Sequence, residues 1–261
     1  ASEDASYSYS ITTSDDDSDT SDSWTITSTS VSWLTLTHTA GASTATLVGI
    51  PDDDDVGSYS VTLTVADAAG ATGTQAFTIV VANTNDAPSI TSTGGTAVDE
   101  DALYSYSITT SDVDSDSSDS WTITSTSVSW LTMTDAGDGT ATLAGTPANG
   151  DVGSHSVTVT VADAAGATDT ETFSIAVANT NDAPTITSTA VTAATEDAAY
   201  TYTVTAADVD SSDTITLTGT TVPSWATFTA STGVLTGTPL DADVGDNSVV
   251  ITASDGTASV T

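Results

Sequence analysis

Acidic and amide side chains recur in this chain in two short patterns that could bind a metal ion. Asp-Val-Asp occurs at Asp112–Asp114 and again at Asp208–Asp210. Asn-Thr-Asn-Asp occurs at Asn83–Asp86 and again at Asn179–Asp182. Carboxylate, amide and backbone carbonyl oxygens are the hard ligands that Ca²⁺ takes in sets of about six to eight. Mg²⁺ demands a stricter octahedron and transition metals prefer His or Cys, so these patterns favour calcium.

All of the charged side chains carry the same sign. The chain has no Lys or Arg against 36 Asp and Glu, which makes its formal charge −36. Two like charges about 4 Å apart repel by about 1 kcal/mol even in bulk water. Carboxylates that converge must therefore stay well solvated or recruit a cation from outside the chain. The alternative, that Asp only forms turns and keeps the chain soluble, suits the Asp run at 52–55 better than the recurring patterns.

The same composition excludes several functions. Binding to nucleic acid or to an anionic membrane needs basic side chains, and so does catalysis by a lysine nucleophile or an arginine clamp. The absence of Cys excludes disulfides and thiol catalysis. No apolar run approaches the roughly 20 residues of a membrane span, so we expect no membrane insertion of this segment. Ser, His and Asp are not spaced as a nucleophile elbow or triad, and the sequence predicts no enzyme.

The elements that must position these oxygens belong to a unit that repeats three times. Similar segments begin at Glu3, Glu100 and Glu196, each opening a copy of about 95 residues. We predict three domains. They are residues 1–86, which lack a first strand, residues 87–182, which are complete, and residues 183–261, which lack the last strand.

Each unit alternates apolar and Ser/Thr residues with a period of two. Clear examples are Tyr104–Thr109, Val157–Val161 and Phe173–Val177, and Gly, Asp, Asn and Pro separate such runs. About seven short strands in 95 residues predict an all-β chain of tandem immunoglobulin-like, cadherin-like antiparallel β-sandwiches. We expect Trp130, with its counterparts Trp33 and Trp225, to fill the space between the two sheets.

Several motifs together resemble a known family. They are Asn179-Thr-Asn-Asp-Ala-Pro184, Thr195-Glu-Asp197, Asp208-Val-Asp210, Pro223-Ser-Trp225, Gly237-Thr-Pro239 and Ala253-Ser-Asp-Gly256. The combination is similar to the bacterial cadherin-like repeats, which include the dystroglycan-type and putative immunoglobulin (He-PIG) modules of large surface adhesins. The resemblance covers essentially the whole chain.

The resemblance also implies a set of calcium ligands, because cadherins hold calcium between consecutive domains. At the first junction it implies Glu3, either Asp54 or Asp55, Asp67, Asn83, Asn85, Asp86, Asp112, Asp114 and Asp163. At the second junction it implies Glu100, Asp151, Asn179, Asn181, Asp182, Asp208, Asp210 and Asp255. The linker begins with Asn where the family has Asp, which indicates fewer carboxylates or fewer ions at each junction.

Two hypotheses about function follow. The first is a calcium-stiffened structural stalk or filament segment of an exported prokaryotic cell-surface adhesin, located outside the cell. Its partners would be further copies of the repeat and laterally associated chains. The alternative is an adhesion module that binds glycans or a like copy on a neighbouring cell. The near identity of the first two units favours the stalk, since a recognition site would mark one copy.

Overall fold

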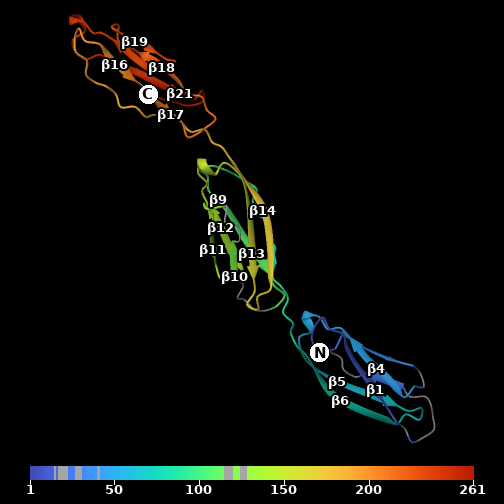
Figure 1. Ribbon diagram of the computed structural model, residues 1–261. Coiled ribbons are helices and arrows are strands. Elements are labelled where there is room, and N and C mark those ends of the chain that lie inside the picture. Colours follow the sequence, from blue (N-terminus) through green and yellow to red (C-terminus); the bar gives the residue numbers. More distant parts are fainter. Residues whose placement is uncertain (15, 17–22, 27–30, 40–41, 115–119, 124–127) are drawn as a thin grey trace.

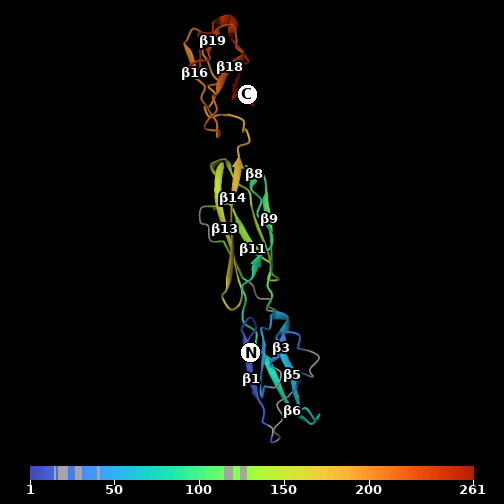
Figure 2. The same cartoon turned by 90° about the vertical axis from the view of Figure 1, so that its right-hand side faces the viewer.

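The computed structural model describes residues 1–261 apart from 15, 17–22, 27–30, 40–41, 115–119 and 124–127. Three β-sandwiches follow one another in an extended row, as two views at right angles show (Figures 1 and 2). The described residues contain no α-helix, only strands and three short 3-10 turns. The prediction of an all-β chain of tandem immunoglobulin-like sandwiches is confirmed.

The first sandwich has two three-stranded sheets. One sheet has the order β1 (Tyr7–Thr12), β4 (Thr44–Gly49), β3 (Leu34–His38). The other has the order β2 (Ser23–Ile26), β5 (Gly57–Ala66), β6 (Thr72–Val81). The 3-10 turn η1 (Asp53–Asp55) precedes β5.

The second sandwich has two four-stranded sheets. One has the order β11 (Thr132–Asp135), β12 (Thr140–Gly145), β9 (Tyr104–Ser111), β7 (Ser89–Ile90). The other has the order β10 (Ser120–Ile123), β13 (Gly153–Ala162), β14 (Thr168–Ala178), β8 (Ala97–Asp99). Strand β8 runs parallel to β14, so this sheet is not purely antiparallel. The 3-10 turn η2 (Asn149–Asp151) precedes β13.

The third sandwich has two three-stranded sheets and one small strand pair. One sheet has the order β16 (Tyr200–Thr203), β20 (Val234–Gly237), β19 (Ala226–Thr229). The other has the order β18 (Thr216–Thr221), β21 (Val250–Ser254), β22 (Ser259–Val260). A small pair joins β15 (Thr185–Ile186) and β17 (Ala206–Ala207), and the 3-10 turn η3 (Asp241–Asp243) precedes β21.

Alternation along the strands builds the core. In β13, Val157, Val159 and Val161 are fully buried while the Thr residues between them face outward. They pack with Leu143 and Ile175 from facing and neighbouring strands in one apolar cluster. The period of two therefore places the apolar face inside and leaves the Ser/Thr face in water.

The tryptophan that recurs in each unit packs against the apolar core, as Trp130 and Trp33 show. Trp130 is partly buried and meets Tyr104 edge to face, with ring centroids 6.0 Å apart. Gly145 ends β12 beside it, and a Cβ at that glycine would overlap the Trp130 carbonyl. Trp33 packs in the same way against Tyr7 in the first sandwich. The expectation that this residue packs between the sheets agrees with its contacts.

Candidate metal centres at the domain junctions

A tight turn places a glutamate at the end of each of the first two sandwiches. Asp4 and Asp101 adopt left-handed φ angles of 55° and 60°, a region that Asp tolerates better than most residues. Their backbone N–H groups donate to the carbonyls of Pro51 and Pro147 at 2.9 and 2.8 Å. The preceding residues, Glu3 and Glu100, are each only 2% exposed.

These glutamates are bound to the linker by one oxygen only. Glu3 Oε1 accepts a hydrogen bond from the backbone N–H of Thr84, and Glu100 Oε1 accepts one from Thr180 at 2.6 Å. The second oxygen, Oε2, is buried in both residues and has no hydrogen-bond partner among the described atoms. Burying a carboxylate oxygen without a hydrogen-bond donor costs free energy of folding. Each of these two Oε2 atoms therefore lies where a cation would lower that cost.

Other carboxylates lie close to the same two glutamates. At the first junction Glu3, Asp53 and Asp86 each offer one oxygen, all within 4.8 Å of one another. At the second junction Glu100, Asp182 and Asp210 do the same. Each group joins a residue of the preceding sandwich to the linker, and the second group also includes the following sandwich.

The second aspartate of the Asp-Val-Asp motif in the next sandwich accepts hydrogen bonds from the linker. Asp114 Oδ2 accepts from the backbone N–H of Asp86 at 2.7 Å, and its Oδ1 accepts from the Asn83 amide at 2.8 Å. At the second junction Asp210 Oδ2 accepts from the N–H of Asp182 at 2.8 Å. The linker and the Asp-Val-Asp motif are therefore in direct contact at both junctions.

The first aspartate of the same motif repeats the pattern of the glutamates. Asp112 Oδ1 accepts from the N–H of Asp114 at 3.1 Å, and Asp208 Oδ1 accepts from Asp210 at 3.0 Å. Their Oδ2 atoms are buried without a partner in the described part of the chain. Asp208 also lies in a third carboxylate group, with Asp213 and Asp255.

The aspartate after the late strand is fixed in its ionised form. The Asn85 amide donates to Asp163 Oδ2 at 2.7 Å and lowers the pKa of that carboxyl, and the N–H groups of Gly166 and Ala167 act in the same direction. The pKa of Asp255 is also lowered, first by the N–H of Ala258. Hydrogen bonds to the charged form favour it, so these carboxylates keep their charge at the junctions.

The two junctions differ at the first residue of the 3-10 turn. Loss of solvent and the charges of Asp86, Asp4 and Glu3 raise the pKa of Asp53. The corresponding residue of the second unit is Asn149, whose amide donates to Asp210 Oδ1 at 3.0 Å. The first junction thus has a repelling carboxylate where the second has a neutral donor.

Some of the residues that we expected to bind calcium lie at the junctions but outside the carboxylate groups. Asp55 and Asp151 turn back to accept from the N–H of Asp52 and Ala148 at 3.1 and 3.0 Å, and Asp54 is exposed. Asn179 lies exposed in the linker.

Asp67 lies far from the first junction. It follows β5, at the end of the sandwich opposite η1, and accepts from Ala71 at 2.8 Å. The ten residues of β5 separate it from the junction by about 33 Å at the usual rise of a strand.

The carboxylate groups include residues that sequence reasoning missed, Asp53 and Asp213, with Asn149 as a supporting donor. The spacing Asp52-Asp-Asp-Asp55 could have indicated Asp53. The fourth residue of such a turn caps the first, as in a capping box, which leaves the second residue free to point elsewhere.

The donor set fits calcium. Glu3, Glu100, Asp112 and Asp208 each hold a buried oxygen that no described group satisfies, and the chain contains no Lys or Arg that could supply the charge. The groups are carboxylates and amides without Cys and without His, which is the hard oxygen chemistry of Ca²⁺.

Comparison with known proteins identifies the repeat. The profile described as "Putative Ig domain" matches residues 1–82 and 183–261, and the profile described as "Bacterial Ig domain" matches residues 85–176. No curated protein matches the chain. No helix among the described residues is long and apolar enough to cross a membrane.

Solved cadherin ectodomains share the fold. Protocadherin gamma B2 domains 1–5 match with a TM-score of 0.59 at 15% identity, covering 92% of this chain and 51% of that one. The protocadherin gamma B4 extracellular domain matches with a TM-score of 0.54 at 17% identity, covering 92% and 42%.

A fucoidan-degrading enzyme also matches, with a weaker structural similarity. An endo-fucoidan hydrolase of glycoside hydrolase family 107 aligns at 25% identity over 99% of this chain and 41% of its own, with a TM-score of only 0.36. This chain therefore spans about half the length of these proteins or less.

Proposed function

Because the chain belongs to the family of putative Ig domains, we propose that it is a calcium-stiffened stalk or filament segment of an exported prokaryotic surface adhesin. Calcium would bind where consecutive sandwiches meet. The modules that we propose are residues 1–86, 87–182 and 183–261.

One observation carries this proposal. Four buried carboxylate oxygens, one each from Glu3, Glu100, Asp112 and Asp208, lie at the two junctions without a partner among the described groups. The net charge of −36 leaves no internal cation to offset them. A fold that buries uncompensated negative charge at both hinges gains stability where cations from the medium reach those hinges.

The ligands of such an ion would come from three parts of the chain. Glu3 and Asp53 would bind from the preceding sandwich, Asp86 from the linker, and Asp112 from the following sandwich. Bound calcium supplies the positive charge that the chain lacks. Asn85 orients Asp163 at the same junction by its hydrogen bond of 2.7 Å.

Bridging of this kind explains a mechanical role. Two sandwiches joined by a short linker pivot freely by default, because the interface between them is small. Carboxylates from both sides that share ions remove this freedom and make a rod. Extracellular modules bind calcium with dissociation constants of about 10⁻⁴ to 10⁻³ M, so depletion of calcium from the medium would soften the rod.

Small-angle scattering and thermal unfolding of the whole chain, each with calcium and with excess chelator, test the proposal. We expect calcium to raise the melting temperature and to lengthen the particle with a narrower spread of shapes. Magnesium at the same concentration serves as the control and should do less. Identical scattering and melting profiles in calcium and in chelator would contradict the proposal.

Its partners and location follow from the same role. A stalk segment contacts further copies of the repeat in its parent protein, and these are the partners that we propose. Chains carrying −36 charges repel one another within a screening length of about 8 Å, so lateral association would need divalent cations too. Because extracellular modules of this kind bind calcium at about 10⁻⁴ to 10⁻³ M, we also propose that the segment lies outside the cell.

A further inference from the structure

The two junctions use different donors for the same carboxylate oxygen. At the first junction Asp114 Oδ1 accepts from the amide of Asn83 in the linker at 2.8 Å. At the second junction the equivalent oxygen, Asp210 Oδ1, accepts at 3.0 Å from the amide of Asn149. Asn179, which has the position of Asn83, is exposed there. The linker thus supplies the donor at one junction, and the preceding sandwich supplies it at the other.

The hydrogen bond from Asn149 joins two sandwiches without the linker. Asn149 lies in η2 of the second sandwich, and Asp210 lies in the third. Asp53 has the position of Asn149 in the first unit, and an ionised carboxylate has no proton to donate. Between described residues no hydrogen bond joins the first sandwich directly to the second, because those at this junction run through residues 83–86.

The carboxylate that accepts this bond is deeply buried. Asp210 is only 3% exposed, whereas Asp114 is partly exposed. Both oxygens of Asp210 have a donor, since Oδ2 accepts from the N–H of Asp182 at 2.8 Å. Water cannot easily replace a donor at a buried carboxylate, so loss of the Asn149 amide would cost more than loss of an exposed contact.

The turn that carries Asn149 is fixed on its own sandwich. The Asp151 carboxylate accepts from the N–H of Ala148 at 3.0 Å, and the Asp151 carbonyl lies 2.6 Å from Nε2 of His155. The His155 ring meets Trp130 edge to face, with ring centroids 6.2 Å apart. The amide of Asn149 therefore extends from a turn that is attached to the core of the second sandwich.

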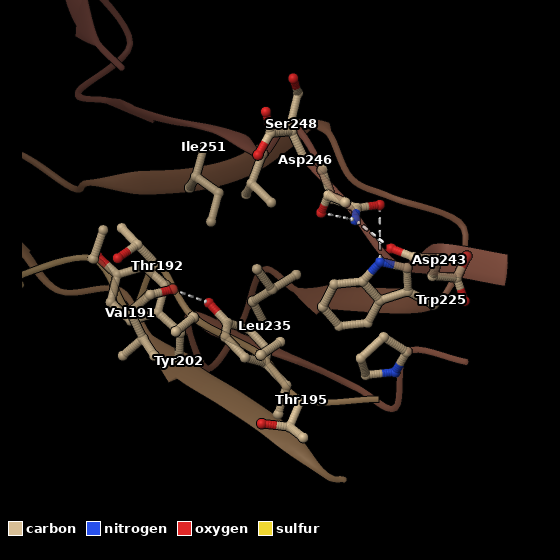
Figure 3. A pocket seen from close by; sticks show the side chains of 18 of the residues that line it. Val191, Thr192, Thr195, Tyr202, Trp225, Leu235, Asp243, Asp246, Ser248 and Ile251 are labelled. Atoms are coloured by element: carbon tan, nitrogen blue, oxygen red, sulfur yellow. Dashed lines mark hydrogen bonds between the residues drawn. The ribbon is translucent and has the colours of Figure 1, made fainter. Parts of the chain in front are cut away.

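The third sandwich attaches its turn with a different side chain. Asn247 has the position of His155, and its amide donates to the carbonyl of Asp243 at 2.8 Å. Trp225 Nε1 donates to Oδ1 of Asn247 at 3.1 Å. Figure 3 shows Asp243 close to Trp225, where these bonds are made. Attachment of the 3-10 turn to the tryptophan is thus a feature of the repeat, and η2 is a rigid support for Asn149.

One repulsion opposes the closed second junction. Oxygens of Glu100 and Asp210 lie within 4.8 Å of each other. Repulsion at that distance favours opening by about fourfold in water and about 400-fold at an effective dielectric constant of about 20. Each hydrogen bond to a charged group favours closure by about tenfold to a hundredfold, and Asp210 accepts one from Asn149 and one from the linker. Together the two bonds offset the repulsion over most of that range, whereas one alone offsets it only near the value for water.

We propose that the second junction is closed by the protein itself, through the hydrogen bond from Asn149 to Asp210, and that calcium sets the orientation of the sandwiches mainly at the first junction. Without calcium, residues 87–261 form one rigid body, and the first sandwich pivots about residues 83–86. Calcium stiffens that hinge, and at the second junction it adds stability to a contact that is already closed. The statement about calcium rests on the proposed function, whereas the closed second junction does not.

Distances between spin labels on the whole chain, measured by double electron–electron resonance, test the proposal. The chain has no Cys, so introduced Cys residues are the only labelling sites. Ser58→Cys with Ser105→Cys spans the first junction, and Ser154→Cys with Thr201→Cys spans the second. All four positions are exposed, and the two pairs have matching places in their units.

In excess chelator we expect a broad distribution of distances across the first junction and a narrow one across the second. Calcium should narrow the first and change the second little. Asn149→Ala should raise the ratio of bent to straight molecules at the second junction about tenfold in chelator, because Asp210 loses a charge-assisted hydrogen bond. Asn179→Ala is the matched control, since this exposed amide donates to no described group, and it should leave the distribution unchanged.

Asn149→Asp tests the same contact with a charge. It gives the second junction the acid that the first has at Asp53, so it removes the donor and adds a repulsion to Asp210. We expect a broader distribution across the second junction than in Asn149→Ala, and we expect calcium to narrow it as it narrows the first. The second junction of this variant should therefore behave like the first junction of the wild type.

Three outcomes would overturn the proposal. They are equally broad distributions at the two junctions in chelator, a second junction that Asn149→Ala leaves unchanged, and equal effects of Asn149→Ala and Asn179→Ala. A second junction that is narrow and depends on Asn149, with no effect of calcium at either junction, would refute the calcium-stiffened stalk and leave the closed second junction intact.

Discussion

Replacing Glu100 by Gln should change the stability of the chain in opposite directions with and without calcium. The glutamine keeps the oxygen that accepts from Thr180 at 2.6 Å and replaces the unpartnered Oε2 by an amide that can donate. In chelator the substitution removes one charge from a group of three carboxylates. In calcium it removes one charged ligand.

The structure sets the size of the first effect. The oxygens of Glu100, Asp182 and Asp210 lie within 4.8 Å of one another, and a pair of charges at that distance repels by about 0.9 kcal/mol in water and about 3.5 kcal/mol at an effective dielectric constant of about 20. We take the value in water for each of the two pairs as a minimum, because Glu100 and Asp210 are buried and only Asp182 is partly exposed. Relief of about 2 kcal/mol corresponds to a rise in Tm of about 8 °C or more for a domain of this size.

The second effect follows from mass action. Stabilisation by a bound ion grows with the logarithm of its concentration over its dissociation constant. Loss of a charged ligand that weakens binding about tenfold removes about 1.4 kcal/mol of stabilisation at saturating calcium. The rise in Tm on adding calcium should therefore be smaller in Glu100→Gln than in the wild type.

Differential scanning calorimetry of the whole chain in chelator and in saturating calcium measures both effects. The matched control is Glu196→Gln, because Glu196 has the same position in the third unit but is exposed and lies outside the described carboxylate groups. It should change Tm little in either condition. The reasoning is refuted if Glu100→Gln lowers Tm in chelator, or if Glu196→Gln behaves like it.

Three further predictions concern single residues. Asp53→Asn should raise Tm in chelator and weaken calcium binding, because it removes a carboxyl whose pKa is raised by lost solvent and by neighbouring carboxylates. Asn149→Asp should do the reverse at the second junction. Calorimetry and calcium titration of both variants measure these changes. The hydrogen bond from Asn85 lowers the folded pKa of Asp163 below its ordinary 3.8, so its contribution to stability is present above that pH and is lost as the pH falls through the lowered value. The difference in Tm between the wild type and Asp163→Asn in chelator should thus shrink in acid, and a constant difference across the pH series would contradict this. Leu143→Ala opens a cavity at a fully buried site and should cost about 3 to 5 kcal/mol in urea unfolding, equally with and without calcium.

Local patterns predicted most of the fold. Alternation in segments such as Val157–Val161 is a property of neighbouring residues, and the pleat of a strand converts it directly into one buried face and one exposed face. The parallel pairing of β8 with β14 was not predicted, because Ala97–Asp99 and Ala176–Ala178 are distant in sequence and neither shows a pattern specific to parallel pairing.

The sequence indicated only some of the residues that meet at the junctions. The linker and the Asp-Val-Asp motif, which both recur next to the boundary between units, are in contact there. The acidic turn did not follow the expectation. Its last residue, Asp55, is used by the N–H of Asp52, and the first residue, Asp53, lies in the carboxylate group.

The amino-acid sequence by itself determined that three like units form β-strands and that any cation at their hinges must come from outside, because strand alternation is local and Lys and Arg are wholly absent. Tertiary structure alone decided which oxygens meet. Glu3 accepts from Thr84, which is 81 residues away in the sequence, and Asp213 meets Asp255 from another strand connection.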